Sequence, residues 1–90
     1  MITRIATFNT EPDLDPVKHE EFRQWMGTQP GLVHGYHLKD TKTGKVMSIS
    51  FWTDRESMLA MKDRVFPGGP LNLKPDTVEI LEVAHTFGPK

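Results

Sequence analysis

The 90-residue sequence contains no cysteine, so neither a disulfide framework nor a thiolate metal site can stabilise it. It also lacks an excess of either charge, because 11 lysines and arginines face 12 aspartates and glutamates, for a net charge of -1. Without a basic excess, the attraction to phosphate that dominates nucleic-acid binding has no source, and we expect no nucleic-acid partner. No run approaches about 18 consecutive apolar residues, and residues 1–8 have no signal-peptide core. We therefore expect a cytoplasmic protein with no membrane partner.

The chain is short for an independent domain. A fold of this size buries only a little over about 60% of the surface of its unfolded chain and is marginally stable alone. Dimerisation is the remaining means of stabilisation when disulfides are absent. The sequence therefore favours a homodimer.

Polar and proline-containing segments divide the chain into six regular elements. Enrichment in β-branched and aromatic residues, with apolar and polar residues largely in alternation, predicts strands at Ile2–Phe8, Leu32–Lys39, 46–53 and 77–87. Apolar residues at helical spacing predict helices at 16–28, with Val17 on the apolar side, and at 54–65. The order β-α-β-β-α-β predicts one α+β domain over residues 1–90, of ferredoxin-like topology. Its four-stranded antiparallel sheet carries two helices on one face.

Local residue types predict where the helices begin and end. Asp15 followed by Pro16 favours a helix start, because aspartate caps free N–H groups and proline fits the first helical position. Thr53 and Glu56 have the spacing of a capping box, which predicts Thr53 as the cap of the second helix. Prolines and glycines at 67–70 are predicted to end that helix and to form a lip over a cleft. They do not predict a phosphate loop, because they follow a helix.

Both faces of the predicted sheet are apolar. In 46–53, Met47, Ile49 and Phe51 alternate with Val46 and Trp52. Two helices can cover only one face, and monomers rarely expose a large apolar patch. The uncovered face is therefore predicted to bind the second subunit.

These features carry a resemblance to a known group of proteins. The first helix bears aromatic residues and is followed by Gln29, Pro30 and Gly31, the next strand contains Gly35, and residues 50–52 (Ser-Phe-Trp) lead directly into the second helix. Over residues 2–87 the chain resembles the dimeric α+β barrel superfamily, and within it the antibiotic biosynthesis monooxygenase-like domains. The resemblance implies two sheets that face each other across a dimer, with a pocket between each sheet and its own helices.

The same resemblance implies several activities. Some members oxygenate aromatic polyketides without metal or flavin, others degrade haem, and the fold alone does not choose between them. The haem-degrading branch needs a histidine and a tryptophan on or after the second helix, and residues 54–75 contain neither. The oxygenase branch is similar in having an asparagine, a tryptophan and an arginine around its pocket, which map to Asn9, Trp25 and Arg64.

The candidate catalytic residues are Asn9 and His85. Asn9 follows the first strand and can present an amide to a developing enolate, or it can form an Asx-turn that ends the strand. His85 shares the parity of Leu81 and Val83 in the last strand and can act as a general base, or it can be a hydrogen-bonded interface histidine.

The candidate substrate-binding residues are Phe22, Trp25 and Arg64. The two aromatic side chains can form the wall of a pocket for a planar ligand, or they can be part of the core. If Gly35 faces the helices, its missing side chain leaves space for a cavity beside Trp25.

We predict neither a metal nor an organic cofactor. His34 and His37 lie three residues apart in a strand and therefore point to opposite faces, and no pair of histidines has metal-ligand spacing. Flavin and nicotinamide fingerprints are absent.

Two functions follow as hypotheses. The first is a cofactor-independent monooxygenase, or a related small-molecule-transforming enzyme, that acts on an aromatic or enolisable substrate in a cleft between helices and sheet. The alternative is a non-catalytic, dimeric ligand-binding or structural module.

Overall fold

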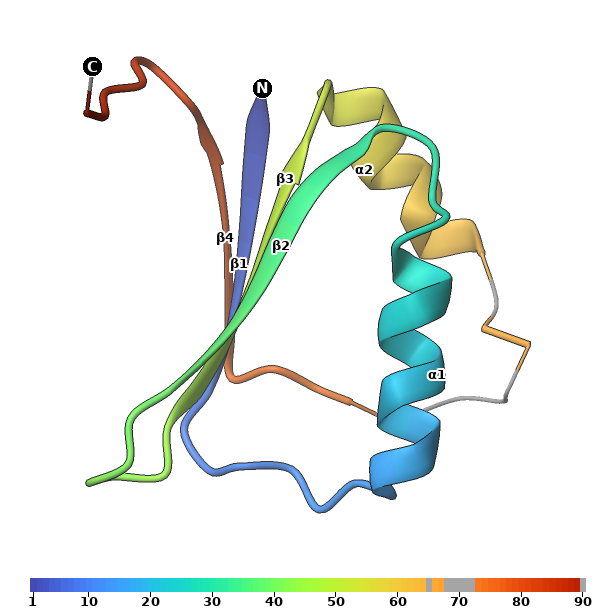
Figure 1. Ribbon diagram of the computed structural model, residues 1–90, viewed down its shortest axis with the longest axis vertical. Helices are drawn as coiled ribbons and strands as arrows, with labels where there is room; N and C mark the ends of the chain where they lie inside the picture. The colour runs from blue at the N-terminus through green and yellow to red at the C-terminus, as the bar shows by residue number, and fades with distance from the viewer. Residues whose placement is uncertain (65, 68–72, 90) are drawn as a thin grey trace.

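Four strands form one antiparallel sheet, and the helices lie along one of its faces (Figure 1). The computed structural model describes residues 1–64, 66–67 and 73–89. The strand order is β2-β3-β1-β4. The elements in chain order are β1 (Ile2–Phe8), α1 (Pro16–Met26), β2 (Leu32–Lys39), β3 (Val46–Trp52), α2 (Arg55–Ala60), the 3-10 turn η1 (Met61–Asp63) and β4 (Thr77–Glu82). This arrangement confirms the predicted ferredoxin-like α+β fold.

Helix α1 begins where the sequence predicts. The Asp15 carboxylate accepts a hydrogen bond of 2.9 Å from the backbone N–H of Val17, and Pro16 occupies the first helical position. The α-helix ends at Met26, two residues earlier than predicted. Val17 does not face the sheet as predicted, because its side chain is 66% exposed.

Helix α2 corrects two predictions. Its cap is Asp54 and not Thr53, since the Asp54 carboxylate accepts a 2.7 Å hydrogen bond from the N–H of Ser57. The carboxylate one residue later therefore takes the capping role, and its donor is the N–H of Ser57 in place of the Glu56 N–H that the predicted capping box assigned to the threonine. The α-helix also ends at Ala60, where the backbone tightens into η1. The predicted end at Val65 and most of the predicted lip lie outside the described residues.

Strand β4 ends at Glu82, whereas the sequence predicted a strand to residue 87. Its one neighbour is β1, which begins at Ile2, and the last bond of the pair joins Val83 N–H to the Met1 carbonyl at 2.9 Å. Beyond that point no strand remains to pair with. Residues 84–89 therefore leave the sheet as an exposed tail.

Strand β2 contains a bulge that changes which side chains face the helices. Leu32 pairs with Trp52 and His34 with Phe51, so Val33 is an extra residue without a partner. After the bulge, Gly35 and His37 share the helix-facing side with Leu32. Continuous alternation along the strand would place Leu32 and His34 on the same face, and the bulge places them on opposite faces, so that prediction is wrong. His34 and His37 point to opposite faces, as predicted.

The tightest packing lies at one end of the helix-facing side. Trp52 is 1% exposed and forms a cluster with Ile2 and Met58, against which Met26 and Leu32 pack. Trp52 also donates its indole N–H to the Ser50 hydroxyl at 2.9 Å. This cluster joins α2 and the last turn of α1 to the sheet, and it leaves the other end of α1 without comparable packing.

A glycine fixes the junction between α1, β2 and α2. Gly31 has a φ of +84°, which L side chains rarely adopt, and its carbonyl accepts a 2.8 Å hydrogen bond from the N–H of Thr53. A Cβ at this position would stand 2.3 Å from the Cβ of Ser57. The chain therefore passes directly against the first turn of α2.

The opposite face of the sheet carries apolar side chains and no helix. By the strand register it presents Ile5, Ile49 and Phe51 in its middle, and Tyr36 and Leu38 on β2 are about half exposed. Tyr36 and Phe51 are edge-to-face, with ring centroids 6.4 Å apart. None of the helices in the described ranges is long and apolar enough to cross a membrane.

Candidate functional site

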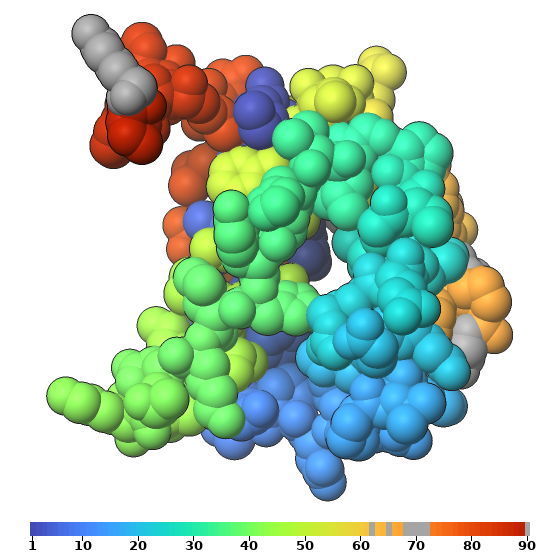
Figure 2. All heavy atoms as spheres, in the orientation of Figure 1, coloured from blue at the N-terminus to red at the C-terminus, as the bar shows by residue number. Residues whose placement is uncertain are grey.

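A cavity of about 470 Å³ lies between α1 and the helix-facing side of the sheet, and a second cavity of about 330 Å³ adjoins it. Figure 2 shows the hollow between α1 and the strands. The two cavities share walls formed by Phe22, Arg23, Met26, His37, Ser48 and Ser50. No residue of α1 is buried. We call the two cavities together the cleft, and it occupies the space that a close-packed helix would otherwise fill.

Helix α1 supplies one wall of the cleft through residues at regular spacing. His19, Phe22, Arg23 and Met26 stand at i, i+3, i+4 and i+7, which places them on one stripe of the helix. All four line the larger cavity. The apolar members of this stripe were predicted to face the sheet, whereas His19, which belongs to the same stripe, was not predicted as a site residue.

The sheet supplies the floor. Arg4 and Ala6 on β1, Ser48 and Ser50 on β3, and His37 on β2 all line the larger cavity. The register aligns Arg4 with Ser50, and Ala6 with Ser48 and then His37. The floor is therefore a band of small and polar side chains, in contrast to the apolar opposite face.

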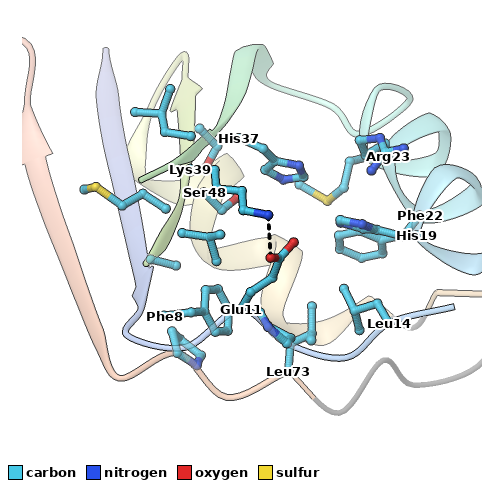
Figure 3. Close-up of a pocket in the computed structure, with 18 of the residues that line it drawn as sticks. Phe8, Glu11, Leu14, His19, Phe22, Arg23, His37, Lys39, Ser48 and Leu73 are labelled. Atoms are coloured by element: carbon cyan, nitrogen blue, oxygen red, sulfur yellow. Dashed lines mark ion pairs between the residues drawn. The ribbon is translucent and has the colours of Figure 1, made fainter. Parts of the chain in front are cut away.

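Two histidines meet across the cleft. The rings of His19 and His37 are stacked with centroids 5.4 Å apart and an interplanar angle of 21° (Figure 3). Burial lowers the pKa of His37, and the repulsion that a second positive charge would meet from a protonated His19 and from Arg23 lowers it further. Burial and Arg23 also lower the pKa of His19, with a smaller opposite effect from Glu20. Both imidazoles are therefore neutral near pH 7 and have a nitrogen free to accept a proton.

Ion pairs lie at the rim of the cleft. Lys39 on β2 and Glu11 in the loop before α1 approach to 2.7 Å across its mouth (Figure 3). On α1, Arg23 pairs with Glu20. Both pairs are about half exposed, so each contributes little to stability. Their effect is to neutralise two of the cations around the cleft.

The third cation, Arg4, lies on the floor. Burial lowers the pKa of its guanidinium. Within the described part of the chain, Arg4 takes part in neither of the two ion pairs and in none of the side-chain hydrogen bonds. It is a half-buried charge whose compensation must come from solvent or from a bound group.

The structure separates the three predicted substrate-binding residues. Phe22 lines both cavities. Trp25 lines neither, and packs instead on Phe22 and Phe66 with ring centroids 5.8 and 5.6 Å away. Arg64 donates a 3.2 Å hydrogen bond to the side chain of Gln29, which ties η1 to the end of α1. Gly35 does face the helices and lines the smaller cavity, but the cavity opens beside Phe22.

The two predicted catalytic residues lie outside the cleft walls. The backbone N–H of Asn9 donates a 2.7 Å hydrogen bond to the Asp76 carboxylate, and its side chain is exposed. His85 lies in the exposed tail after β4. Neither residue lines a cavity, and their catalytic roles stay predictions.

Residues missed by the sequence analysis are His19, His37 and Arg4. His19 was detectable from its spacing to Phe22 and Met26. His37 shares the parity of Gly35, which was already considered as a helix-facing residue. Arg4 shares the parity of Ile2 and Ala6 in β1, so its orientation followed from the strand pattern.

The histidine pair predicts a pH dependence of stability. Because both pKa values are lowered in the folded state, the unfolded chain binds more protons below its ordinary histidine pKa of about 6.5. The free energy of unfolding is therefore expected to fall as the pH is lowered through 6.5, until the folded-state pKa values are passed. Urea denaturation at pH 7.5 and 5.0 measures this fall, and a His19→Gln/His37→Gln variant should show a smaller one. An equal fall in both proteins would contradict the prediction.

Comparison with known proteins gives likeness of structure only. No family model matches the sequence, and no curated protein sequence matches it. SnoaB, a cofactor-independent oxygenase from Streptomyces nogalater, superposes with a TM-score of 0.71 at 17% identity, over 98% of this chain and 97% of that one. The monooxygenase from the gene ActVA-Orf6 of Streptomyces coelicolor, in complex with nanaomycin D, has a TM-score of 0.60 at 13% identity over 99% and 92% of the two chains.

The chain also has the fold of a protein from Deinococcus radiodurans described as an antibiotic biosynthesis monooxygenase, which superposes with a TM-score of 0.71 at 13% identity over all of this chain and 99% of that one. This confirms the resemblance found in the sequence. The same fold occurs in MhuD, whose structure holds two manganese protoporphyrin IX molecules per active site and matches with a TM-score of 0.60 at 12% identity over 99% of this chain and all of that one. At these identities the likeness establishes the fold and leaves the reaction to be argued from the cleft.

Proposed function

We propose that the protein is a cofactor-independent monooxygenase that acts on an aromatic, enolisable substrate in the cleft between α1 and the sheet. The observation that carries the proposal is the cleft itself, which leaves the inner stripe of α1 unpacked and brings two neutral histidines to an apolar cavity. Pockets for small molecules are mostly apolar with a few polar groups. Two solved structures of this fold, SnoaB and the ActVA-Orf6 protein, are described as oxygenases.

His37 is the proposed general base. In an anthrone-type substrate, a ring CH2 group loses one proton to His37, and the resulting enolate is stabilised beside the imidazolium that forms. The enolate gives one electron to O2, and the two radicals combine to form a carbon–oxygen bond. The imidazolium returns its proton to the peroxide, and water is then lost as the O–O bond and the second C–H bond break, which leaves a carbonyl and a neutral His37. One O2 is consumed and one water is released, so the four-electron oxidation of CH2 to C=O balances the reduction of O2.

Oxygen uptake with a panel of anthrones and hydroxyquinones tests this function. We expect substrate-dependent O2 consumption by the purified protein without added metal, flavin or nicotinamide, and a product with one more oxygen atom and two fewer hydrogens for an anthrone. An Asn9→Ala/His85→Ala variant, assayed in parallel, tests the roles predicted for those residues. Binding of these compounds without O2 uptake would overturn the enzyme and favour a non-catalytic ligand-binding module.

We also propose that the protein is a homodimer joined through the open face of the sheet. Ile49 stands at the centre of that face, between Ile5 on β1 and Tyr36 on β2. Light scattering is expected to give about twice the 10.3 kDa chain mass. An Ile49→Lys variant should give a monomer, because the new charge would be buried in the interface. A Thr41→Lys variant in the exposed β2–β3 loop is the control, and a wild-type monomer at micromolar concentration would exclude this dimer.

A further inference from the structure

Arg4 occupies an unusual position for an arginine. It lies on β1, one of the two central strands, and its neighbours in the register are Ser50 on β3 and Ile80 on β4. The other helix-facing residues of the same strand, Ile2 and Ala6, are 5% and 3% exposed. A charged side chain here is held between buried positions and opens onto the larger cavity.

The protein supplies no counter-charge to Arg4 within its described residues. Glu11 and Glu20 line or approach the cleft, but each is already paired, with Lys39 and Arg23 respectively. Taking a charge out of water without a partner is costly, so an unpaired, half-buried arginine at this position opposes folding. Because Arg4 is present despite this cost in folding free energy, we expect it to have a partner outside the chain. A ligand that enters the larger cavity can be that partner.

Ser50 provides a hydrogen-bond donor next to Arg4. Residues directly opposite in an antiparallel pair have Cβ atoms about 5 Å apart. The Ser50 oxygen already accepts a hydrogen bond from the Trp52 indole N–H at 2.9 Å, which leaves its own O–H free to donate. Ser50 and Arg4 both line the larger cavity. The Arg4 guanidinium has donors alone and the Ser50 hydroxyl adds one more, and such a group of donors is the pattern that binds an oxyanion.

This donor pair is separated from the histidines by the width of β3. Arg4 lies on β1 and His37 on β2, with β3 between them, so their strands are about 10 Å apart. They are also offset along the sheet, because Arg4 is opposite Ser50 and His37 is opposite Ser48. A ligand that reaches both must be elongated, on the scale of fused aromatic rings.

We propose that the cleft takes planar aromatic acids, with the carboxylate held by Arg4 and Ser50 and the reacting carbon placed at His37. This assignment of substrate class rests on the proposed function for the cleft as the substrate site. The acid group stays charged throughout the reaction, so Arg4 acts in binding and orientation and His37 acts in proton transfer.

A matched pair of ligands tests the assignment in the wild-type protein. Anthraquinone-2-carboxylate and anthraquinone-2-carboxamide have nearly the same shape and differ in charge. Calorimetry is expected to show that the carboxylate binds at least about 10-fold more tightly, as charge-assisted hydrogen bonds imply. Equal affinity of the two ligands would overturn the proposal.

Variants test whether the preference for the carboxylate ligand depends on Arg4. Arg4→Met is expected to remove the preference for the carboxylate while changing carboxamide affinity by less than about two-fold. Arg55→Met, on the exposed side of α2, removes the same charge away from the cleft and should retain the preference. Loss of affinity for both ligands in Arg4→Met would mean that Arg4 only shapes the cavity.

Thermal unfolding provides a readout that a structural role would not give. Because Arg4 has no partner among the described residues, Arg4→Met is expected to raise the Tm, whereas a structural arginine would lower it on removal. The oxygenase function and the carboxylate site at Arg4 can be rejected independently of each other. Selective carboxylate binding without O2 uptake would reject the oxygenase and retain the acid site, whereas O2 uptake with equal rates on neutral and acidic substrates would do the reverse.

Discussion

A His37→Gln variant is expected to consume O2 about 10²- to 10⁴-fold more slowly than the wild type, with little change in KM. Glutamine keeps a polar side chain of similar size on the floor of the cleft but cannot accept the substrate proton at neutral pH. The loss should fall on kcat, because proton abstraction occurs after binding. Oxygen-electrode assays with an anthrone substrate measure both constants.

The chain contains a matched control for this experiment. His34 lies on the same strand, but its register position opposite Phe51 places it on the open face. His34→Gln should therefore leave turnover within about two-fold of wild type, provided that the oligomeric state is unchanged. If His34→Gln and His37→Gln slow the reaction equally, or if neither does, His37 is not the base. A loss in the Asn9→Ala/His85→Ala variant alone would instead support the residues predicted from the sequence.

Gly31→Ala is expected to destabilise the protein by about 2 kcal/mol or more. Two costs add at this position: about 1 kcal/mol or more for a Cβ at positive φ, and a further 1–3 kcal/mol, roughly, for forcing atoms into a packed junction. The first turn of α2 would have to move, because the new Cβ would stand 2.3 Å from that of Ser57. Urea denaturation monitored by tryptophan fluorescence gives the free energy of unfolding.

Gly44→Ala separates the two costs. Gly44 has a similar φ of +78° in the β2–β3 loop, but a Cβ there would meet no atom within 4 Å. Its substitution is therefore expected to cost about 1 kcal/mol, from backbone conformation alone. Equal losses in the free energy of unfolding for Gly31→Ala and Gly44→Ala would show that the first turn of α2 moves aside at no energetic cost.

The sequence was sufficient for the element order because each element has its own local periodicity. Asp15 and Pro16 start α1 through bonds made within a few residues, and alternation identifies β3 without knowledge of its partners. Errors occurred where the outcome depends on a distant segment. The end of β4 is set by the start of β1, and Asp54 replaces Thr53 as a cap because of the conformation that the chain takes on leaving β3.

The site was less predictable than the fold for the same reason. His19 and His37 are 18 positions apart, and only the distance between α1 and the sheet makes them a pair. His85 was predicted from the parity of Leu81, but β4 ends three residues before it, and Leu81 lies with Thr3 and Phe51 on the face away from the helices. Phe22 was predicted correctly as a helix residue that faces the sheet. Its place in the cavity wall depends on the distance between α1 and the sheet, which no local sequence pattern encodes.

The extra residue in β2 has a consequence for sequence alignment. Val33 shifts the phase of the strand by one, and it is the reason that His37 reaches the cleft while Tyr36 lies on the opposite face. A homologue without this residue would alternate regularly from Leu32 to the equivalent of His34, and the equivalent of His37 would still face its cleft. Alignments of distantly related chains that run through residue 33 without a gap would therefore equate cleft residues with interface residues. A shift that brought Val33 into the ladder opposite Phe51 would exchange the two sets within a single strand, which offers a short mutational route between different clefts on one fold.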